Sequence, residues 1–522
     1  MKYPIGIQNF EDIRTNGYVY VDKTALVHKL VAEGKYYFLS RPRRFGKSLL
    51  LSTMRAYFEG KRHLFHGLAM EQLEQDWTEY PILYLDLNAR DYSSREALIA
   101  ELNKHLEQWE MLYCGAHSDR AIEERFGAVI KAAAQKTGKK VVILVDEYDK
   151  PMLQAIGNEE LQSPYRAILK AFYANLKSSD EYIRFAFLTG VTKFGKVSVF
   201  SDLNHLFDIS FDRRYTQICG ITEQELHHCF DDSVALLAEA NGMGKEECYE
   251  RLREDFDGYH FEWNTPGMYN PFSVLNTLAS QQFRDYWFDT GTPSFLVHQL
   301  KKTKFPLAEM TERNLSADTL NSIDIMDENP LPLLYQSGYL TITNYDNRFG
   351  TYTLGFPNRE VREGFIKYLV PFYTPKTSTA STFNIRQFVR EVEKGQAEDF
   401  MRRLESFFAS GDYALMGDKE LYFHNATYVF FSLMGLYMEV ERHTTDGRMD
   451  VLVTTPDYIY IFELGIDKSA DIALQQIEDK QYAAPFAADK RKLFKIGINF
   501  STQTGRIDDW KIALPKNQQP LI

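Results

Sequence analysis

A short apolar segment, a turn rich in arginine and a helical pattern follow one another between residues 38 and 58. The turn ends in Gly46, Lys47 and Ser48, which match the second half of the phosphate-binding pattern Gly-x-x-x-x-Gly-Lys-Ser/Thr. Arg41 stands where that pattern has its first glycine. Apolar residues then recur at helical spacing, as expected of a helix packed on a sheet. The segment therefore predicts a strand, a phosphate loop and a helix.

The start of such a helix is suited to an anion, because its first N–H groups have no partner within the helix and its dipole is positive there. We therefore expect ATP to be bound by Arg44, Phe45, Gly46, Lys47, Ser48 and Leu49. Lys47 is expected to reach the β and γ phosphates, and the Ser48 hydroxyl to sit on Mg²⁺. The alternative interpretation is a basic turn before an amphipathic helix.

A second motif supports the first. Five apolar, mostly β-branched residues at 141–145 end in Asp146 and Glu147. A buried parallel strand delivers acids in this way to the carboxyl edge of a sheet, which is a Walker B pattern. Asp146 would hold the metal through water or Ser48, and Glu147 would polarise the attacking water. An acidic pair that merely caps a helix is the alternative, and it does not explain the two motifs together.

Strands and helices alternate through residue 218, which predicts a parallel α/β domain. The strands are expected at residues 36–39, 81–87, 141–145, 182–192 and 206–211. Thr189 and Thr192, at the end of one strand, would contact the γ-phosphate or orient water, or would only cap a turn. Arg213 and Arg214 follow the last strand, and either would serve as an arginine finger unless both are ordinary surface residues.

The next region, 219–372, predicts a helical lid and a winged-helix-like part. Thr222 to Leu226 opens a helix with a capping box, and a hairpin is expected around Asp346 and Asn347. Residues 373–382 are low in hydrophobicity and predict a linker. The chain from 383 to 522 would then form the last domain.

A hairpin in this last domain carries two acids. With its turn at Pro456 and Asp457, Asp450 faces Glu463 directly, with Cβ atoms about 5 Å apart. Two negative charges at this distance repel each other unless a cation neutralises them, and the expected cation is Mg²⁺ or Mn²⁺. An exposed acid pair at a frayed strand end is the alternative. The weaker additional candidates are Glu441 and His424.

Composition limits the class of protein. A chain of 522 residues is too long for one hydrophobic core and suggests about three domains. The longest nearly apolar run is eleven residues, at 428–438, which is too short to span a membrane. The scattered cysteines Cys114, Cys219, Cys229 and Cys248 fit a reducing cytoplasm rather than a zinc site. A net charge of −12 argues against a protein that coats nucleic acid with its whole surface.

Several segments resemble the bacterial AAA-ATPase-like family. They are the N-terminal Tyr3-Pro-Ile-Gly, Phe10 and Tyr20-Val-Asp-Lys-Thr, followed by Arg41-Pro-Arg-Arg-Phe-Gly-Lys-Ser, Val145-Asp-Glu-Tyr-Asp-Lys-Pro, Thr189-Gly-Val and Phe200-Ser-Asp-Leu-Asn. The C-terminal part resembles the PD-(D/E)xK nuclease superfamily. This resemblance is carried by Gly447-Arg-Met-Asp, Ile461-Phe-Glu and Ala473-Leu-Gln-Gln-Ile with Lys480-Gln-Tyr. Arginine at position 41 is usual in the first family, so it does not count against nucleotide binding.

The resemblance implies a P-loop ATPase and an α/β nuclease core. Asp450 and Glu463 would be metal ligands, and Gln476 would lie near them. The nuclease lysine two residues after the glutamate is Gly465 here, and its loss would cost several kcal/mol of transition-state stabilisation unless another cation replaces it. The candidates for that cation are Lys468, Lys480 and Arg448.

The sequence thus predicts a cytoplasmic ATPase fused to a nuclease-like domain that binds or cuts nucleic acid, DNA more than RNA, with no membrane partner. Conflict with mobile DNA is suggested by analogy alone. A homo-oligomer is compatible with the sequence. The alternatives are an ATP-driven switch with an inactive nuclease-like binding module, and a scaffold in which neither site turns over.

Overall fold

In a computed structural model the chain forms two compact units, Met1–Phe305 with Thr311–Arg362 and Pro306–Met310 with Glu363–Ile522. The structure describes residues 1–115, 120–194, 205–289, 296, 299–300, 302–321, 323, 329–373, 385–409, 418–442 and 450–513. Within these residues no helix has the length and apolar character needed to cross a membrane.

The first unit is organised around a parallel sheet with strand order β2-β3-β4-β1-β5. Its strands are β1 (Tyr36–Ser40), β2 (Ile82–Asp86), β3 (Val141–Asp146), β4 (Ile183–Gly190) and β5 (Phe207–Asp208). All residues of β1 and β3 are buried, as expected of strands covered on both faces. β4 lies between β1 and β3, so the ends of the phosphate-loop strand and the acidic strand flank Thr189. The last strand has two residues, shorter than the expected 206–211.

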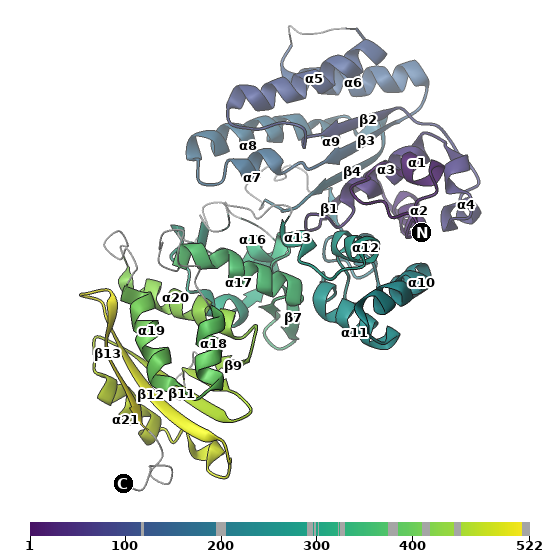
Figure 1. The fold of residues 1–522 in the computed structure, drawn as a ribbon. Coiled ribbons are helices and arrows are strands. Elements are labelled where there is room, and N and C mark those ends of the chain that lie inside the picture. Colours follow the sequence, from purple (N-terminus) through teal and green to yellow (C-terminus); the bar gives the residue numbers. More distant parts are fainter. Residues whose placement is uncertain are drawn as a thin grey trace, which may run out of the picture. The chain divides into compact units, whose positions relative to one another are not determined.

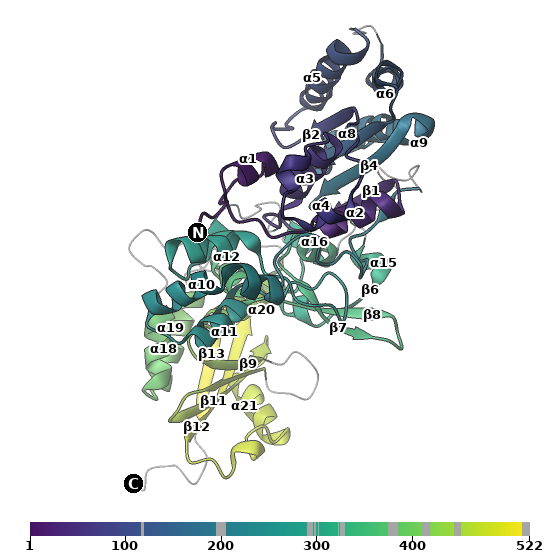
Figure 2. The ribbon, with the colours of Figure 1, turned by 90° about the vertical axis from the view of Figure 1, so that its right-hand side faces the viewer.

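Helices cover the sheet (Figures 1 and 2). α3 (Lys47–Phe58) packs on β3 and β4, and α6 (Ile122–Thr137) packs on β3 and beside α5 (Arg95–Tyr113). A buried ion pair between Arg125 Nε and Glu110 Oε1, at 2.8 Å, joins α5 and α6. The other helices of this part are α1 (Phe10–Thr15), α2 (Thr24–Glu33), α4 (Ala69–Leu73), α7 (Lys150–Gln154), α8 (Glu159–Tyr173) and α9 (Asn175–Ser178).

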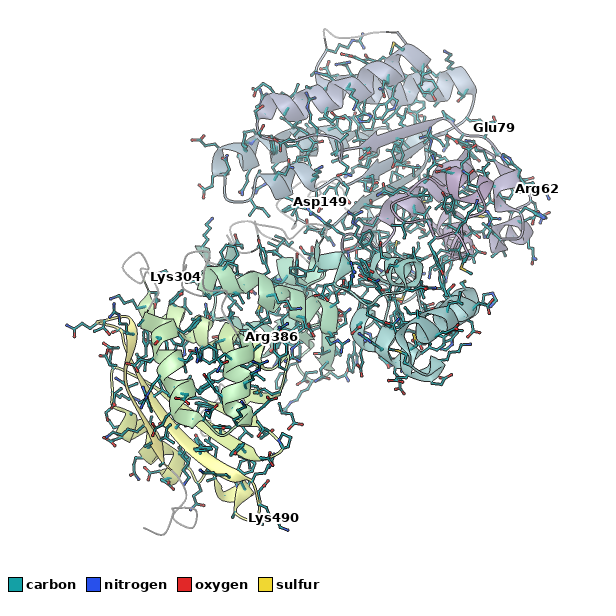
Figure 3. The ribbon with its side chains drawn as sticks, in the orientation of Figure 1. Arg62, Glu79, Asp149, Lys304, Arg386 and Lys490 are labelled. Atoms are coloured by element: carbon teal, nitrogen blue, oxygen red, sulfur yellow. The ribbon has the colours of Figure 1, made fainter. Side chains whose placement is uncertain are left out.

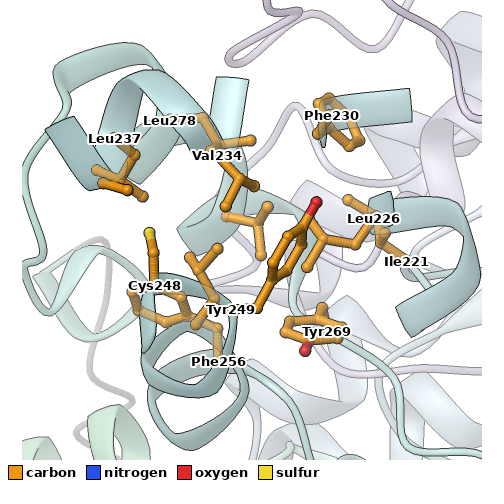
Figure 4. Packing of buried hydrophobic residues seen from close by; sticks show 13 residues of the cluster. Ile221, Leu226, Phe230, Val234, Leu237, Cys248, Tyr249, Phe256, Tyr269 and Leu278 are labelled. Atoms are coloured by element: carbon orange, nitrogen blue, oxygen red, sulfur yellow. The ribbon is translucent and has the colours of Figure 1, made fainter. Parts of the chain in front are cut away.

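A helical lid follows in the same unit, formed by α10 (Glu223–Asn241), α11 (Lys245–Phe256) and α12 (Pro271–Ser280). These helices enclose one hydrophobic cluster, whose members point toward one another in Figure 4. The predicted capping box is present: the Thr222 hydroxyl accepts from the Glu225 N–H, and the Glu225 carboxylate accepts from the Thr222 N–H. The residues at the start of α10 therefore satisfy N–H groups that have no partner within the helix.

The winged-helix-like part consists of a helix and a three-stranded sheet. α16 (Leu331–Gln336) precedes the hairpin of β7 (Thr341–Asp346) and β8 (Thr351–Gly355), and β6 (Asn314–Ser316) pairs with β8. The hairpin turns at the predicted place, while β6 was not expected. All six residues of α16 are buried, so this helix offers no exposed face to a nucleic-acid groove.

The second unit contains a mixed sheet with order β13-β12-β11-β10-β9. The strands are β9 (Glu439–Arg442), β10 (Val451–Thr454), β11 (Tyr458–Ile466), β12 (Lys492–Ser501) and β13 (Arg506–Ala513). β11 and β12 are parallel, and the other neighbours are antiparallel. The division between the units falls within α17 (Arg359–Tyr373).

The two faces of this sheet carry different helices (Figure 2). Aromatic contacts from α19 (Ala397–Ala409) and α20 (Lys419–Met434) reach Phe462, with ring centroids 5.7 and 5.2 Å from those of Phe400 and Phe431. α18 (Ile385–Glu393) packs against α19 and α20 on that side. α21 (Ala470–Asp479) covers the opposite face, which bears Glu463. The acid is therefore enclosed between the sheet and α21.

α20 begins at Lys419, six residues before the predicted start at 425, because Asp418 caps it. The Asp418 side chain accepts a hydrogen bond of 3.1 Å from the Leu421 N–H. The predicted linker falls almost entirely in 374–384, which lies outside the described residues.

Candidate functional site

A cavity of about 510 Å³ opens at the carboxyl ends of β1 and β3, within the size range of small-molecule sites. The phosphate loop contributes Arg43, Arg44, Gly46, Lys47, Ser48 and Leu49 to its wall. The N-terminal residues 4–8, α12 and Trp287 contribute further parts of the wall, and so do Asn88, Glu147 and Lys150. Most of the predicted ATP-binding residues thus meet in one cavity.

The conformation of the loop is set by contacts within the chain. Gly46, with φ of 93°, has the left-handed conformation that favours glycine, and the helix α3 starts directly after it. The Lys47 ammonium is buried: its Nζ donates to the carbonyl oxygens of Arg41 at 3.0 Å and Pro42 at 3.3 Å, and lies 3.5 Å from Glu147 Oε1. The Phe45 side chain is also buried and packs on Tyr259 and Phe261, so it supports the loop rather than lining the cavity.

Arg41 occupies the place of the missing glycine as a structural residue. Its guanidinium is buried and donates to the carbonyl oxygens of Ser40 and Ser210, both at 2.9 Å, and of Tyr215 at 3.3 Å. It lies 3.9 Å above the ring centroid of Phe261. Burial lowers the pKa of Arg41 to about 10. The loop is thus held by packing and by a buried cation.

The predicted metal-binding oxygens converge. Thr189 Oγ1 donates to Asp146 Oδ1 at 2.8 Å, and the Ser48 hydroxyl lies close enough to lower the pKa of Asp146. Burial raises the pKa of Asp146, and the charge of Glu147 raises it further. A hydroxyl and a carboxylate side by side suit Mg²⁺, whose charge would favour the ionised Asp146. Thr189 and Asp146 lie beneath the cavity wall, and Glu147 forms part of it.

Thr192, the other predicted threonine, binds a different acid. Asp149, labelled in Figure 3, is fully buried and accepts from the Thr192 N–H and hydroxyl, both at 2.6 Å. Burial raises the pKa of Asp149 to about 6. Thr192 therefore anchors the turn after β4, which was the alternative interpretation of its position.

Neither arginine-finger candidate lines the cavity. Arg214 Nη2 lies 2.6 Å from Asp212 Oδ2, and its Nη1 lies 3.4 Å from Glu33 Oε2. Arg213 Nη2 lies 3.8 Å from Glu262 Oε1. Within this chain both are surface ion-pairing residues.

The acids of the second unit lie side by side. Val451 pairs with Phe462 in the antiparallel β10–β11 ladder, which places Asp450 opposite Glu463 as the hairpin predicted. The Leu464 N–H donates to Asp450 Oδ2 at 2.7 Å. Gln476, on α21, donates from Nε2 to Glu463 Oε1. All three predicted residues therefore belong to one cluster.

Burial and the neighbouring acid disfavour the ionised forms of the two carboxyls in this cluster. Burial and the charge of Asp450 raise the pKa of Glu463 to about 8, and burial raises the pKa of Asp450. Among the residues that the structure describes, none forms a hydrogen bond with the buried Glu463 Oε2. A divalent ion bound by both carboxylates would satisfy that oxygen and remove the repulsion. Among the described residues no group of three or more His, Cys, Asp or Glu side chains forms a metal site.

The remaining candidates are only partly described. His424 lies close enough for its charge to lower the pKa of Asp450. Glu441 pairs with Leu452 through its main chain, and its side chain lies outside the described part of the chain, as does the whole of Arg448.

Position 465 has room for a Cβ atom. A Cβ added to Gly465 would lie 3.4 Å from the Ile498 carbonyl oxygen and 3.8 Å from Lys468 Cβ. Lys468 therefore starts next to the place of the missing lysine, and its charge lowers the pKa of Glu463.

Sequence reasoning missed several residues of the first site. The cavity is also lined by Asn88 and Trp287, which belong to no motif. Two other parts of the wall lie in family segments that do not themselves mark a phosphate site. These are residues 4–6, in Tyr3-Pro-Ile-Gly, and Lys150, in Val145-Asp-Glu-Tyr-Asp-Lys-Pro.

Known proteins resemble the chain along most of its length. The family described as Predicted AAA-ATPase matches residues 4–200, and the PD-(D/E)XK nuclease superfamily matches residues 418–510. A protein of Azotobacter chroococcum mcd 1, described as an uncharacterized protein in the vnfD 5′ region, is 36% identical over 519 residues, which are 96% of each chain. The Aeropyrum pernix ORC2 protein (ADPNP-ADP complexes) matches with a TM-score of 0.25 and 10% identity over 64% of this chain and 88% of its own. That last similarity is too low to support an argument.

Proposed function

Since the chain belongs to the family of predicted AAA-ATPases and carries a PD-(D/E)XK nuclease-superfamily domain, we propose that it binds and hydrolyses ATP and that its second unit acts on DNA. The four scattered cysteines favour a cytoplasmic location, and action on mobile DNA is the role suggested by analogy.

The observation that carries the ATPase proposal is the meeting of the phosphate loop, Ser48 with Asp146, and Glu147 at one cavity. Lys47 and the N–H groups at the start of α3 bind the β and γ phosphates. Ser48 and Asp146 would hold Mg²⁺, which would neutralise phosphate charge. Glu147, held 3.5 Å from Lys47 in this structure, is released to the attacking water when the phosphates attract the ammonium.

The test is phosphate release together with binding of a fluorescent ATP analogue. Lys47→Ala should abolish binding, because it removes the buried ammonium. Glu147→Gln keeps the shape of the site and should bind ATP with hydrolysis reduced about 100-fold or more. Equal binding by Lys47→Ala and the natural chain would refute the proposed phosphate site.

For the second unit, the partnerless Glu463 Oε2 beside Asp450 carries the proposal of a Mg²⁺ or Mn²⁺ site. Two carboxylates and Gln476 would hold the ion next to a scissile phosphate. The test is cleavage of single- and double-stranded DNA with either ion, with and without ATP, and RNA as the competing substrate. Asp450→Ala should abolish cleavage, and retention of cleavage in that variant would refute the site.

A second candidate function is favoured by Gly465, which leaves the domain without the lysine of its superfamily. In this case the unit binds metal and DNA without cutting, and the ATPase acts as a switch. Gly465→Lys separates the two functions, since the position has room for a Cβ atom. Cleavage gained only in this variant would identify a binding module, whereas cleavage by the natural chain would show that another cation replaces the lysine.

A further inference from the structure

A lysine outside the phosphate loop lies at the wall of the nucleotide cavity. Lys150 is the first residue of α7 and follows the acidic strand by four positions. Its N–H donates to the Glu147 carbonyl oxygen at 3.1 Å, so its backbone is tied to the residue expected to activate water. Lys150, Glu147 and Lys47 all line the same cavity.

Neutral groups hold the ammonium of Lys150. Its Nζ donates to Asn88 Oδ1 at 2.9 Å and to the Asn88 carbonyl oxygen, and Asn88 also lines the cavity. In the part of the chain that the structure describes, no carboxylate lies within ion-pair distance of this Nζ. Its charge is therefore not neutralised by a neighbouring acid, and an incoming anion competes only with an amide and a carbonyl oxygen.

The other cations are less well placed. Arg213 and Arg214 bind carboxylates away from the cavity. Arg44 lines it, but its guanidinium lies 4.7 Å above the ring centroid of Phe272. Arg43 is exposed at the wall, and its carbonyl oxygen accepts from Trp287 Nε1 at 3.2 Å. Lys150 is half-buried and lies three residues after Glu147, which is expected to activate the water that attacks the γ-phosphate.

We propose that Lys150 contacts the γ-phosphate of ATP and serves in cis as the cation usually supplied by an arginine finger. This inference rests on the proposed ATPase function. The water oxygen forms a bond to the γ-phosphorus while the bond from that phosphorus to the β–γ bridging oxygen breaks, and the electron pair leaves with ADP. The water proton passes to Glu147 and then to solvent. Lys150 stabilises the negative charge on the γ-phosphoryl oxygens throughout this step.

The experiment compares Lys150→Ala, Lys150→Arg and Arg214→Ala in the full chain. Lys150→Ala should lower the rate of hydrolysis about 100-fold, and Lys150→Arg should restore part of it because the charge is kept. Arg214→Ala is the matched control and should hydrolyse ATP at the natural rate. The second readout is the ratio of ADP to ATP dissociation constants, which should fall about tenfold in Lys150→Ala because ADP lacks the contacted phosphate.

Unchanged hydrolysis and an unchanged preference for ATP over ADP in Lys150→Ala would overturn the assignment, and so would a larger loss in Arg43→Ala. If the natural chain binds ATP without turnover, the ATPase proposal fails, and the preference for ATP over ADP alone then supports or refutes the Lys150 contact. If the natural chain binds no ATP, both are refuted.

Discussion

The carboxyl of Glu463 should make the second unit less stable at high pH when no metal is bound. Its pKa is raised from 4.5 to about 8 by burial and by Asp450. Between pH 4.5 and about pH 8, Glu463 is therefore still protonated in the folded chain but already ionised in the unfolded chain. This stabilisation is complete below pH 4.5 and is lost as the pH rises through about 8.

The size of the effect follows from the two pKa values. Each pKa unit corresponds to about 1.4 kcal/mol of unfolding free energy. Between pH 5 and pH 8 the carboxyl should therefore remove on the order of 3 kcal/mol of stability from the metal-free second unit. Glu463→Gln keeps the side-chain shape but does not titrate, so the variant should lack this fall.

Hydrogen exchange of the β11 and β12 amides in the full chain, with a chelator present, measures the effect locally. Comparing the natural chain with Glu463→Gln at each pH cancels the intrinsic exchange rate. Asp479→Asn removes an exposed carboxylate of α21 whose partner is Gln475 of the same helix, and it is the matched control. Parallel pH profiles for the natural chain and Glu463→Gln would refute the reasoning. Saturating Mg²⁺ should protect the natural chain more at pH 8 than at pH 5, because binding displaces the proton.

Three further variants test the first unit. Thr189→Val removes the hydroxyl that donates to Asp146, and phosphate-release assays should show hydrolysis slowed about tenfold with ATP binding nearly unchanged; weaker binding alone would contradict this. Arg125→Met takes the buried guanidinium from Glu110 and should destabilise the α5–α6 pair by about 3 kcal/mol in denaturant unfolding, a loss that a surface pair would not give. Asp149→Ala leaves the Thr192 N–H without its buried acceptor and should lower the melting temperature by several degrees, and an unchanged melting temperature would contradict its structural role.

Much of the architecture was predictable, because its signals are local. The apolar strands before Ser40 and Asp146 form as expected, and so does the hairpin that brings Asp450 to Glu463. The residues from 492 to 513 were not assigned, although β12 and β13 complete the second sheet there. Nine of the ten residues of β12 are buried, including Lys495 and Asn499, so its polar residues do not alternate with apolar ones as they do in a half-exposed strand.

The candidate sites were predictable only as far as their residues lie within motifs. Asn88, Trp287 and residues 4–8 reach the nucleotide cavity through tertiary packing, which leaves no mark on their local sequence. The structural role of Asp149 could not be predicted from the sequence for a different reason. The end of β3 and the turn after it contain three acids, and only their burial and partners distinguish Asp146, the proposed metal ligand, from the structural Asp149.

With arginine in place of glycine at position 41, the phosphate loop loses its conformational freedom when the chain folds and not when the ligand binds. Glycine loses more backbone freedom on ordering than any other residue, so a glycine-rich loop that orders on its ligand weakens binding by that entropy. Here the Arg41 guanidinium and the Phe45 ring are fixed in the folded interior. The ordering cost therefore belongs to folding, and calorimetry should show a small heat-capacity change on nucleotide binding. In the proposed ATPase cycle, the loop would keep its shape after ADP departs and would accept the next ATP without a separate ordering step.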